Sequence, residues 1–184
     1  MFNRLLNWLK LKLEAWTQKK SLNISGKESE KRMTSKREHS LKNLSEFEID
    51  LDQSLPGCKN FTWREALYCP RWNIHAVPTA DVIRRITNFA PKVQIVRDFL
   101  GLPMLTESWW RPPKYNALIG GAQFSEHMDG GALDFKCPGM SGDQLRHMLQ
   151  PKLEEFGLRM EDLPGASWVH IDDKEPGNKR FFKP

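Results

Sequence analysis

The chain has 184 residues, 28 Lys and Arg against 23 Asp and Glu, a formal net charge of +5 and a pI near 9.2. This length suits one compact domain with an appendage, because a domain usually takes ~100–200 residues. The basic excess lies before Lys42 and the remainder is nearly balanced. The composition therefore argues against a specific nucleic-acid partner for the main domain.

Residues 1–20 predict a basic amphipathic helix. Its apolar stripe, at helical spacing, consists of Phe2, Leu5, Leu6, Leu9, Leu13 and Trp16. Charged residues interrupt this stripe too soon for a membrane span, and it lacks the uninterrupted apolar core of a secretory signal. We expect the helix either to lie on an anionic membrane surface or to pack on its own domain or a partner protein. No export signal is evident, so we expect a cytoplasmic protein unless another route releases it.

Residues 21–45 form a charged segment with few large apolar side chains. Such a segment cannot bury enough surface to offset the entropy of ordering, which predicts a flexible linker. We expect the main domain to cover residues 46–184. Residues 45–55 alternate apolar and acidic side chains, which is typical of a short edge strand or a docking segment.

Helical signals then follow in the chain. Thr62, with Glu65 three positions later, predicts a capped short helix. After Thr79 a stronger helix is expected over residues 80–89, interrupted at Pro91 and followed by a second helical stretch that ends at Gly101. A further helix is expected within residues 139–157, where four apolar residues recur at helical spacing.

Three cysteines, Cys58, Cys69 and Cys137, form no Cys-x-x-Cys pair. An odd number without such a pair indicates neither a zinc knuckle nor a complete disulfide framework. A Cys58–Cys69 disulfide in an oxidising compartment and three free thiols both remain open, with free thiols the default.

Three strands are expected around one face. Residues 103–110 read as a strand, and residues 132–135 and 168–172 alternate between apolar and polar side chains. Neighbouring side chains on a strand point to opposite faces of the sheet. Asp134 therefore points to the face away from Leu133, and His170 and Asp172 point to the face away from Val169. We therefore predict an α+β fold whose small antiparallel sheet is flanked by helices and carries the site.

His127, Asp134 and His170 are the candidate metal ligands on this face. Two imidazoles and one carboxylate are a set that catalytic zinc commonly uses, with a fourth position left for water. Gly130 and Gly131 fit a backbone that turns tightly, or passes close to another group, before the strand that bears Asp134.

An ordered set of motifs resembles the zinc D-alanyl-D-alanine carboxypeptidase and dipeptidase family, which includes phage L-alanyl-D-glutamate endopeptidases and shares its metal fold with the hedgehog signalling domain. The motifs are Ser108-Trp109-Trp110-Arg111, Asn116, Gly120-Gly121-Ala122, Ser125-x-His127 with Asp134, and His170-x-Asp172. The resemblance implies zinc held by His127, Asp134 and His170.

The resemblance also implies a peptidase that cleaves the peptide stem of bacterial peptidoglycan at a bond involving a D-amino acid. Ser125 and Arg111 would contact the substrate, with Arg111 holding a carboxylate or a developing oxyanion. The alternative for Arg111 is a salt bridge that only orders the loop. Without an export signal, such a protein is expected to be cytoplasmic or phage-associated and to act at the cell wall. Trp110, beside Arg111, could add an aromatic wall over the metal, although at least one of Trp109 and Trp110 is expected in the core.

One position departs from the family pattern. Many members carry an acid three residues before the last histidine as general base, and this chain has Ser167 there. A serine cannot accept a proton as a carboxylate does at neutral pH. Asp172 is the best substitute by strand face, or else it orients a ligand histidine. Other acids, less well placed, are Asp173, Glu175, Glu126 and Asp129.

Two other functions therefore stay open. The missing acid permits a zinc-containing module that binds cell wall without cutting it. The basic helix permits a structural or assembly component, for instance of a phage particle.

Overall fold

The computed structural model describes residues 49–176 and 179–183. The chain divides at residue 49 into two units, and the fold below is that of the unit Asp50–Pro184. The predicted amphipathic helix at residues 1–20 and the predicted linker at residues 21–45 lie outside the described residues. Among the described helices, none is long and apolar enough to cross a membrane. The unit combines helices with two small sheets, which confirms the predicted α+β class.

The larger sheet has five strands in the order β3-β4-β6-β5-β7. Their bounds are β3 Leu105–Ser108, β4 Ala132–Lys136, β6 Val169–Asp172, β5 Arg159–Glu161 and β7 Phe181–Phe182. The four longer strands pair antiparallel, and β7 adds a parallel pair at the edge beside β5. The carboxyl-terminal tail therefore returns to cover the edge of the sheet.

Alternation along β4 and β6 separates the core from the site as predicted. Leu133, Phe135, Val169 and Ile171 are each 0% exposed, and β4 and β6 pair so that Asp134 lies opposite His170. Because paired residues share a face of an antiparallel sheet, the carboxylate and the imidazole stand side by side.

Smaller elements lie at one end of the unit, around the α2 helix Trp63–Leu67, the β1–β2 pair Tyr68–Cys69 and Ile74–His75, and the α4 helix Pro113–Leu118. The expected cap of α2 is confirmed, because Glu65 accepts hydrogen bonds from both the backbone N–H and the hydroxyl of Thr62. Of the segment 45–55, only residues 49–55 are described, and within them Ser54 forms an isolated bridge with Thr62 rather than an edge strand.

A single long helix, α3 Ala80–Leu100, replaces the two helical stretches expected around Pro91. Pro91 lies inside this helix, at a cost of ~3 kcal/mol for the missing hydrogen bond and the ring clash. Phe89, Ala90 and Val93 are each 0% exposed around it. Burial of this face, worth about 1.5–3 kcal/mol for each large side chain, outweighs the cost of the proline.

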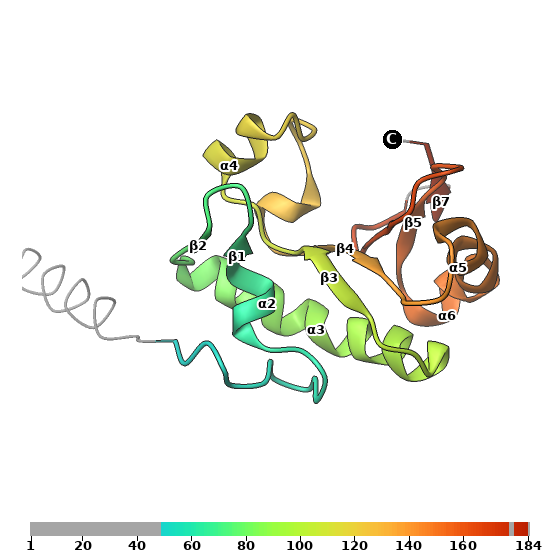
Figure 1. Ribbon diagram of the computed structural model, residues 1–184, viewed down its shortest axis with the longest axis horizontal. Helices are drawn as coiled ribbons and strands as arrows, with labels where there is room; N and C mark the ends of the chain where they lie inside the picture. Colours follow the sequence, from blue (N-terminus) through green and yellow to red (C-terminus); the bar gives the residue numbers. More distant parts are fainter. Residues whose placement is uncertain (1–48, 177–178, 184) are drawn as a thin grey trace, which may run out of the picture. The chain divides into compact units, whose positions relative to one another are not determined.

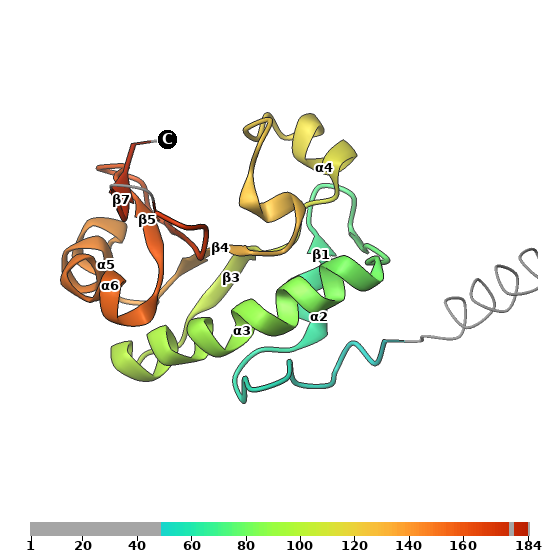
Figure 2. The same ribbon diagram turned by 180° about the vertical axis from the view of Figure 1, so that it is seen from behind.

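The helix expected within residues 139–157 divides instead into α5 Gly142–Leu149, the 3₁₀ turn η2 Gln150–Lys152 and α6 Leu153–Phe156. Pro151 explains the division, because its nitrogen has no hydrogen to donate to the preceding turn. In both views, α3 runs beneath β3 and β4, while α4 and the α5–α6 pair stand at opposite ends of the unit (Figures 1 and 2).

The three cysteines are buried and free, as the default expectation had it. Cys58 and Cys69 form no disulfide.

Candidate metal centre

His127, Asp134 and His170 converge, although 43 positions separate the two histidines in the sequence. Nε2 of His127 lies 3.1 Å from Oδ1 of Asp134 and 3.1 Å from Nδ1 of His170. Nδ1 of His170 lies 2.8 Å from the same Asp134 oxygen. All three side chains are buried.

This donor triangle fits one zinc ion. Zinc bonds of ~2.0–2.1 Å in a tetrahedron place neighbouring ligand atoms roughly 3.3 Å apart. The observed spacings of 2.8 to 3.1 Å are a few tenths of an ångström shorter. Two imidazole nitrogens and a carboxylate oxygen also match the donor types of catalytic zinc sites.

The position and protonation of His127 are fixed by its neighbours. It lies in the short 3₁₀ turn η1 Glu126–Met128, where the Ser125 hydroxyl accepts from its backbone N–H. Its Nδ1 lies 2.6 Å from the carbonyl oxygen of Trp109. A carbonyl can only accept, so Nδ1 carries the hydrogen and Nε2 keeps its lone pair for a metal.

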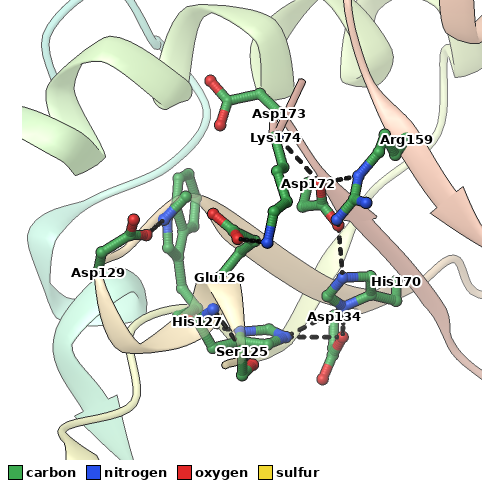
Figure 3. A network of polar contacts seen from close by, with 12 residues as sticks. Ser125, Glu126, His127, Asp129, Asp134, Arg159, His170, Asp172, Asp173 and Lys174 are labelled. Carbon is green, nitrogen blue, oxygen red and sulfur yellow. Dashed lines mark hydrogen bonds and ion pairs between the residues drawn. The ribbon is translucent and has the colours of Figure 1, made fainter. Parts of the chain in front are cut away.

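His170 is oriented in the same way by Asp172. Its Nε2 lies 3.2 Å from Oδ2 of Asp172, so the proton of the neutral ring sits on Nε2 and Nδ1 is free to bind metal. Asp172 is itself held by Arg159, whose Nε and Nη2 donate at 2.8 and 2.9 Å. Figure 3 shows Asp172 lying between Arg159 and His170, away from Asp134.

Electrostatics in the absence of a metal ion follow from these contacts. Burial would lower the pKa of His170, but its hydrogen bonds with Asp134 and Asp172 raise that pKa to about 9. Burial does lower the pKa of His127, although Asp134 opposes the shift. Burial would raise the pKa of Asp134, but the two histidines hold it well below its usual range.

Gly130 and Gly131 allow helix α3 to pack directly on the loop between His127 and Asp134. A Cβ on Gly130 would lie 2.6 Å from the Ile86 side chain, and one on Gly131 would lie 2.1 Å from the Arg85 guanidinium. Gly130 also has φ +95°, a conformation that favours glycine. The close approach expected at these glycines is thus made by α3.

Arg111 contacts the ligand carboxylate. Its Nη2 donates to Oδ2 of Asp134, and its Nε donates to the Ser108 hydroxyl at 2.7 Å. The arginine therefore occupies one oxygen of Asp134 and leaves the other directed at the two histidines. Of the two roles considered for Arg111, ordering the site is visible in these contacts.

A cavity of about 430 Å³ opens over the three donors. Ser125 and Arg111, the predicted substrate contacts, both line it, along with Glu107, Tyr115, Glu161 and Trp168. Its volume lies within the range of ~300–1,000 Å³ that is usual for ligand pockets.

The aromatic wall comes from a different tryptophan than predicted. Trp110 is buried, its indole donates to the Met128 carbonyl at 3.0 Å, and it is not among the residues that line the cavity. Trp109 is likewise core, and its indole donates to the Gly130 carbonyl at 3.1 Å. Trp110 therefore does not form the predicted wall, because both indole N–H groups donate to carbonyl oxygens of the loop that carries His127.

Trp168 forms part of the cavity wall instead, on a segment held by the buried Arg146. This arginine donates to the carbonyl oxygens of Trp168 at 2.8 Å and Ala166 at 2.9 Å. Asn116 has a similar role on the opposite side, where its amide donates to the Ala122 carbonyl at 2.9 Å. Both residues hold loops at the cavity.

Most of the acids considered as general bases are used elsewhere. Asp129 and Asp173 pair with Arg85, at 3.4 and 2.5 Å, and Glu126 pairs with Lys174 at 2.8 Å. None of these three lines the cavity, and Glu175 does not line it either. Ser167 is exposed and also lies outside the cavity lining.

Asp172 does not line the cavity either, and it is 0% exposed. Burial would raise its pKa, but His170 and Arg159 lower it to about 2. Of the two roles considered for Asp172, the geometry favours orienting His170 over accepting a proton from substrate water.

Glu161 is a cavity residue that sequence reasoning missed. Burial raises its pKa, while the charges of His170 and Arg111 oppose the shift and those of Asp134 and Asp172 add to it. The alternation of Arg159, Met160 and Glu161 could have suggested a strand, but only the order of strands in the sheet places Glu161 beside His170.

Comparison with known proteins agrees with this geometry. The family model described as Peptidase M15 matches residues 59–172, a range that includes all three metal-ligand candidates. No curated protein matches the chain. The match covers more than half of the 184 residues, and M15 peptidases are typically zinc enzymes that act on peptidoglycan-type substrates. The chain belongs to the peptidase M15 family, among the peptidases that resemble zinc D-alanyl-D-alanine carboxypeptidase.

Proposed function

We propose that this protein is a zinc peptidase that hydrolyses peptidoglycan stem peptides at a bond involving a D-amino acid, as a D,D-carboxypeptidase, dipeptidase or L,D-endopeptidase. The observation that carries the proposal is the buried triangle of His127 Nε2, Asp134 Oδ1 and His170 Nδ1 at the base of a cavity. Bound there, zinc would lower the pKa of a water molecule toward ~7 and polarise the scissile carbonyl.

Two residues of the cavity would bind the substrate and offset its negative charge. Ser125 and Arg111 line the same cavity as the three donors. The guanidinium of Arg111 offsets negative charge on a substrate carboxylate or on the carbonyl oxygen during attack, while its contact with Asp134 holds that ligand in place.

Asp172 would act as a positioning residue. It fixes the tautomer of His170, and Arg159 holds Asp172 with two hydrogen bonds. Ligand histidines whose second nitrogen is held in this way bind metal more tightly.

The test of the proposal is digestion of purified peptidoglycan by zinc-loaded protein, followed by mass spectrometry of the released peptides. The expected result is a product set cut at one type of bond by the wild type and absent with His127→Ala. Absence of product from the zinc-loaded wild type, or equal product from His127→Ala, would reject the peptidase.

A non-catalytic wall-binding protein is the second candidate, and Ser167 in place of the usual acid favours it. In that case the zinc-loaded protein would sediment with peptidoglycan and release nothing. Removal of zinc would then weaken sedimentation, which separates this function from an inert protein.

A further inference from the structure

Hydrolysis at this site needs a group that takes a proton from the attacking water, and the usual position holds Ser167. Asp172 is buried behind His170, and the acids Glu126, Asp129 and Asp173 are held in ion pairs outside the cavity. The described part of the chain leaves two glutamates in the cavity lining, Glu107 and Glu161, beside the ligand Asp134.

Sheet register places Glu161 next to the metal ligand. Strand β5 pairs antiparallel with β6, with Arg159 opposite Asp172 and Met160 opposite Ile171. The next position in this register sets Glu161 opposite His170. Paired side chains share a face and have Cβ atoms about 4.5–5.5 Å apart, so the Glu161 carboxylate stands over the same face as the ligands.

Glu161 also differs from Glu107 in its partners. Glu107 pairs with Lys136 at 3.0 Å, and its side chain is 41% exposed. The Glu161 carboxylate has no ion-pair partner among residues 49–176 and 179–183. In β7, Phe182 pairs with Glu161, and the Phe182 ring centroid lies 6.4 Å from that of His170.

The donor atoms of His127, Asp134 and His170 lie within 4.8 Å of one another, and Glu161 is not part of that group. Glu161 nevertheless lines the same cavity as the three ligands. A general base must share the substrate cavity with the metal ligands without taking a coordination position itself, and Glu161 meets both conditions.

From this position and this lack of a competing partner, we infer that Glu161 is the general base of the reaction and replaces the acid missing at Ser167. The inference rests on the proposed peptidase function. Glu161 accepts a proton from water as the water oxygen bonds to the scissile carbonyl carbon. The carbon–nitrogen bond then breaks, Glu161 passes the proton to the leaving nitrogen, and the products are a carboxylic acid and an amine, with Glu161 returned to the carboxylate.

The experiment compares Glu161→Gln with Glu107→Gln, a matched change of another carboxylate in the same cavity. Each zinc-loaded variant is assayed for kcat and KM on the stem peptide that the wild type cleaves. Bound zinc is measured by atomic emission. We expect Glu161→Gln to lose about 10²–10⁴-fold in kcat with zinc content and KM near wild type, because general-base catalysis contributes this much. We expect Glu107→Gln to stay within about tenfold of wild type, ~1.4 kcal/mol in barrier.

A readout that does not need turnover uses cobalt(II) in place of zinc. The visible spectrum of cobalt reports changes at the coordination position that faces the cavity. We expect the pH-dependent transition of this spectrum to shift in Glu161→Gln and to stay unchanged in Glu107→Gln.

The outcomes separate the two claims. An active wild type with near-normal kcat in Glu161→Gln overturns the inference and leaves the peptidase intact. Loss of zinc from Glu161→Gln also overturns it, because the residue would then support the metal. A wild type that cleaves nothing rejects the peptidase and, with it, a catalytic Glu161, whether or not the cobalt spectrum shows that Glu161 contacts the site.

Discussion

Changing Asp172 to Asn tests whether this buried carboxylate sets the metal-binding form of His170. The carboxylate oxygen lies 3.2 Å from Nε2 of His170 and accepts its proton. An amide of the same shape can instead donate to Nε2, which moves the ring proton to Nδ1, the atom directed at the other ligands. We expect zinc affinity to fall 10–100-fold, equivalent to about 1.4–2.7 kcal/mol.

The complication is that Asp172 also accepts from Arg159 at 2.8 and 2.9 Å and from the backbone N–H of Lys174 at 3.0 Å. Asp172→Asn therefore leaves a mostly buried guanidinium without its counter-charge, which destabilises the fold by about 3–5 kcal/mol. Arg159→Gln is the matched control, because it breaks the same ion pair and keeps the carboxylate against His170.

Zinc affinity is measured by competition with a chromophoric chelator at neutral pH, and stability by urea unfolding. We expect both variants to unfold at lower urea and only Asp172→Asn to lose zinc affinity by tenfold or more, about 1.4 kcal/mol. If Asp172→Asn binds zinc as the wild type does, or if Arg159→Gln loses as much affinity, Asp172 does not control the tautomer.

Three further predictions concern packing, acid stability and thiols. Gly130→Ala places a Cβ 2.6 Å from the fully buried Ile86 side chain at a φ of +95°, and we expect a loss of about 1–3 kcal/mol in urea unfolding, whereas no loss would mean that α3 does not pack on the loop. The pKa of Asp172 is lowered from 3.8 to about 2 in the folded protein. Ionised Asp172 therefore adds on the order of 2 kcal/mol to the free energy of unfolding above pH ~4, and this stabilisation is lost as the pH falls through about 2. Acid unfolding of the zinc-free protein should show this loss, and Asp172→Asn should lack it. Burial raises the pKa of Cys58 to about 11, so we expect all three buried thiols to resist Ellman's reagent until unfolding, and rapid labelling of the native protein would contradict their burial.

The sequence was sufficient to predict that His127, Asp134 and His170 come together, because two local signals coincide at them. Alternation put Asp134 and His170 on the non-core face of their strands, and the spacing of the motif supplied His127 in the adjoining loop. Both signals are short-range, and the structure preserves them.

Features that depend on long-range packing could not be predicted in this way. The local sequence at Pro91 predicts a helix end, yet α3 continues past it because the apolar residues around Pro91 are buried in the core. From the sequence, a tryptophan before Arg111 could line the cavity, yet both indoles are buried and donate hydrogen bonds to the carbonyl oxygens of Met128 and Gly130. The place of Glu161 depends on β5 lying beside β6, which the sequence order does not show.

The most direct test of the zinc centre is a crystal of the zinc-loaded protein measured on both sides of the zinc absorption edge. We expect one anomalous peak bonded to Nε2 of His127, Oδ1 of Asp134 and Nδ1 of His170, at about 2.0–2.2 Å from each. A peak at other residues, or none while the three side chains stay bonded only to one another, would contradict the account.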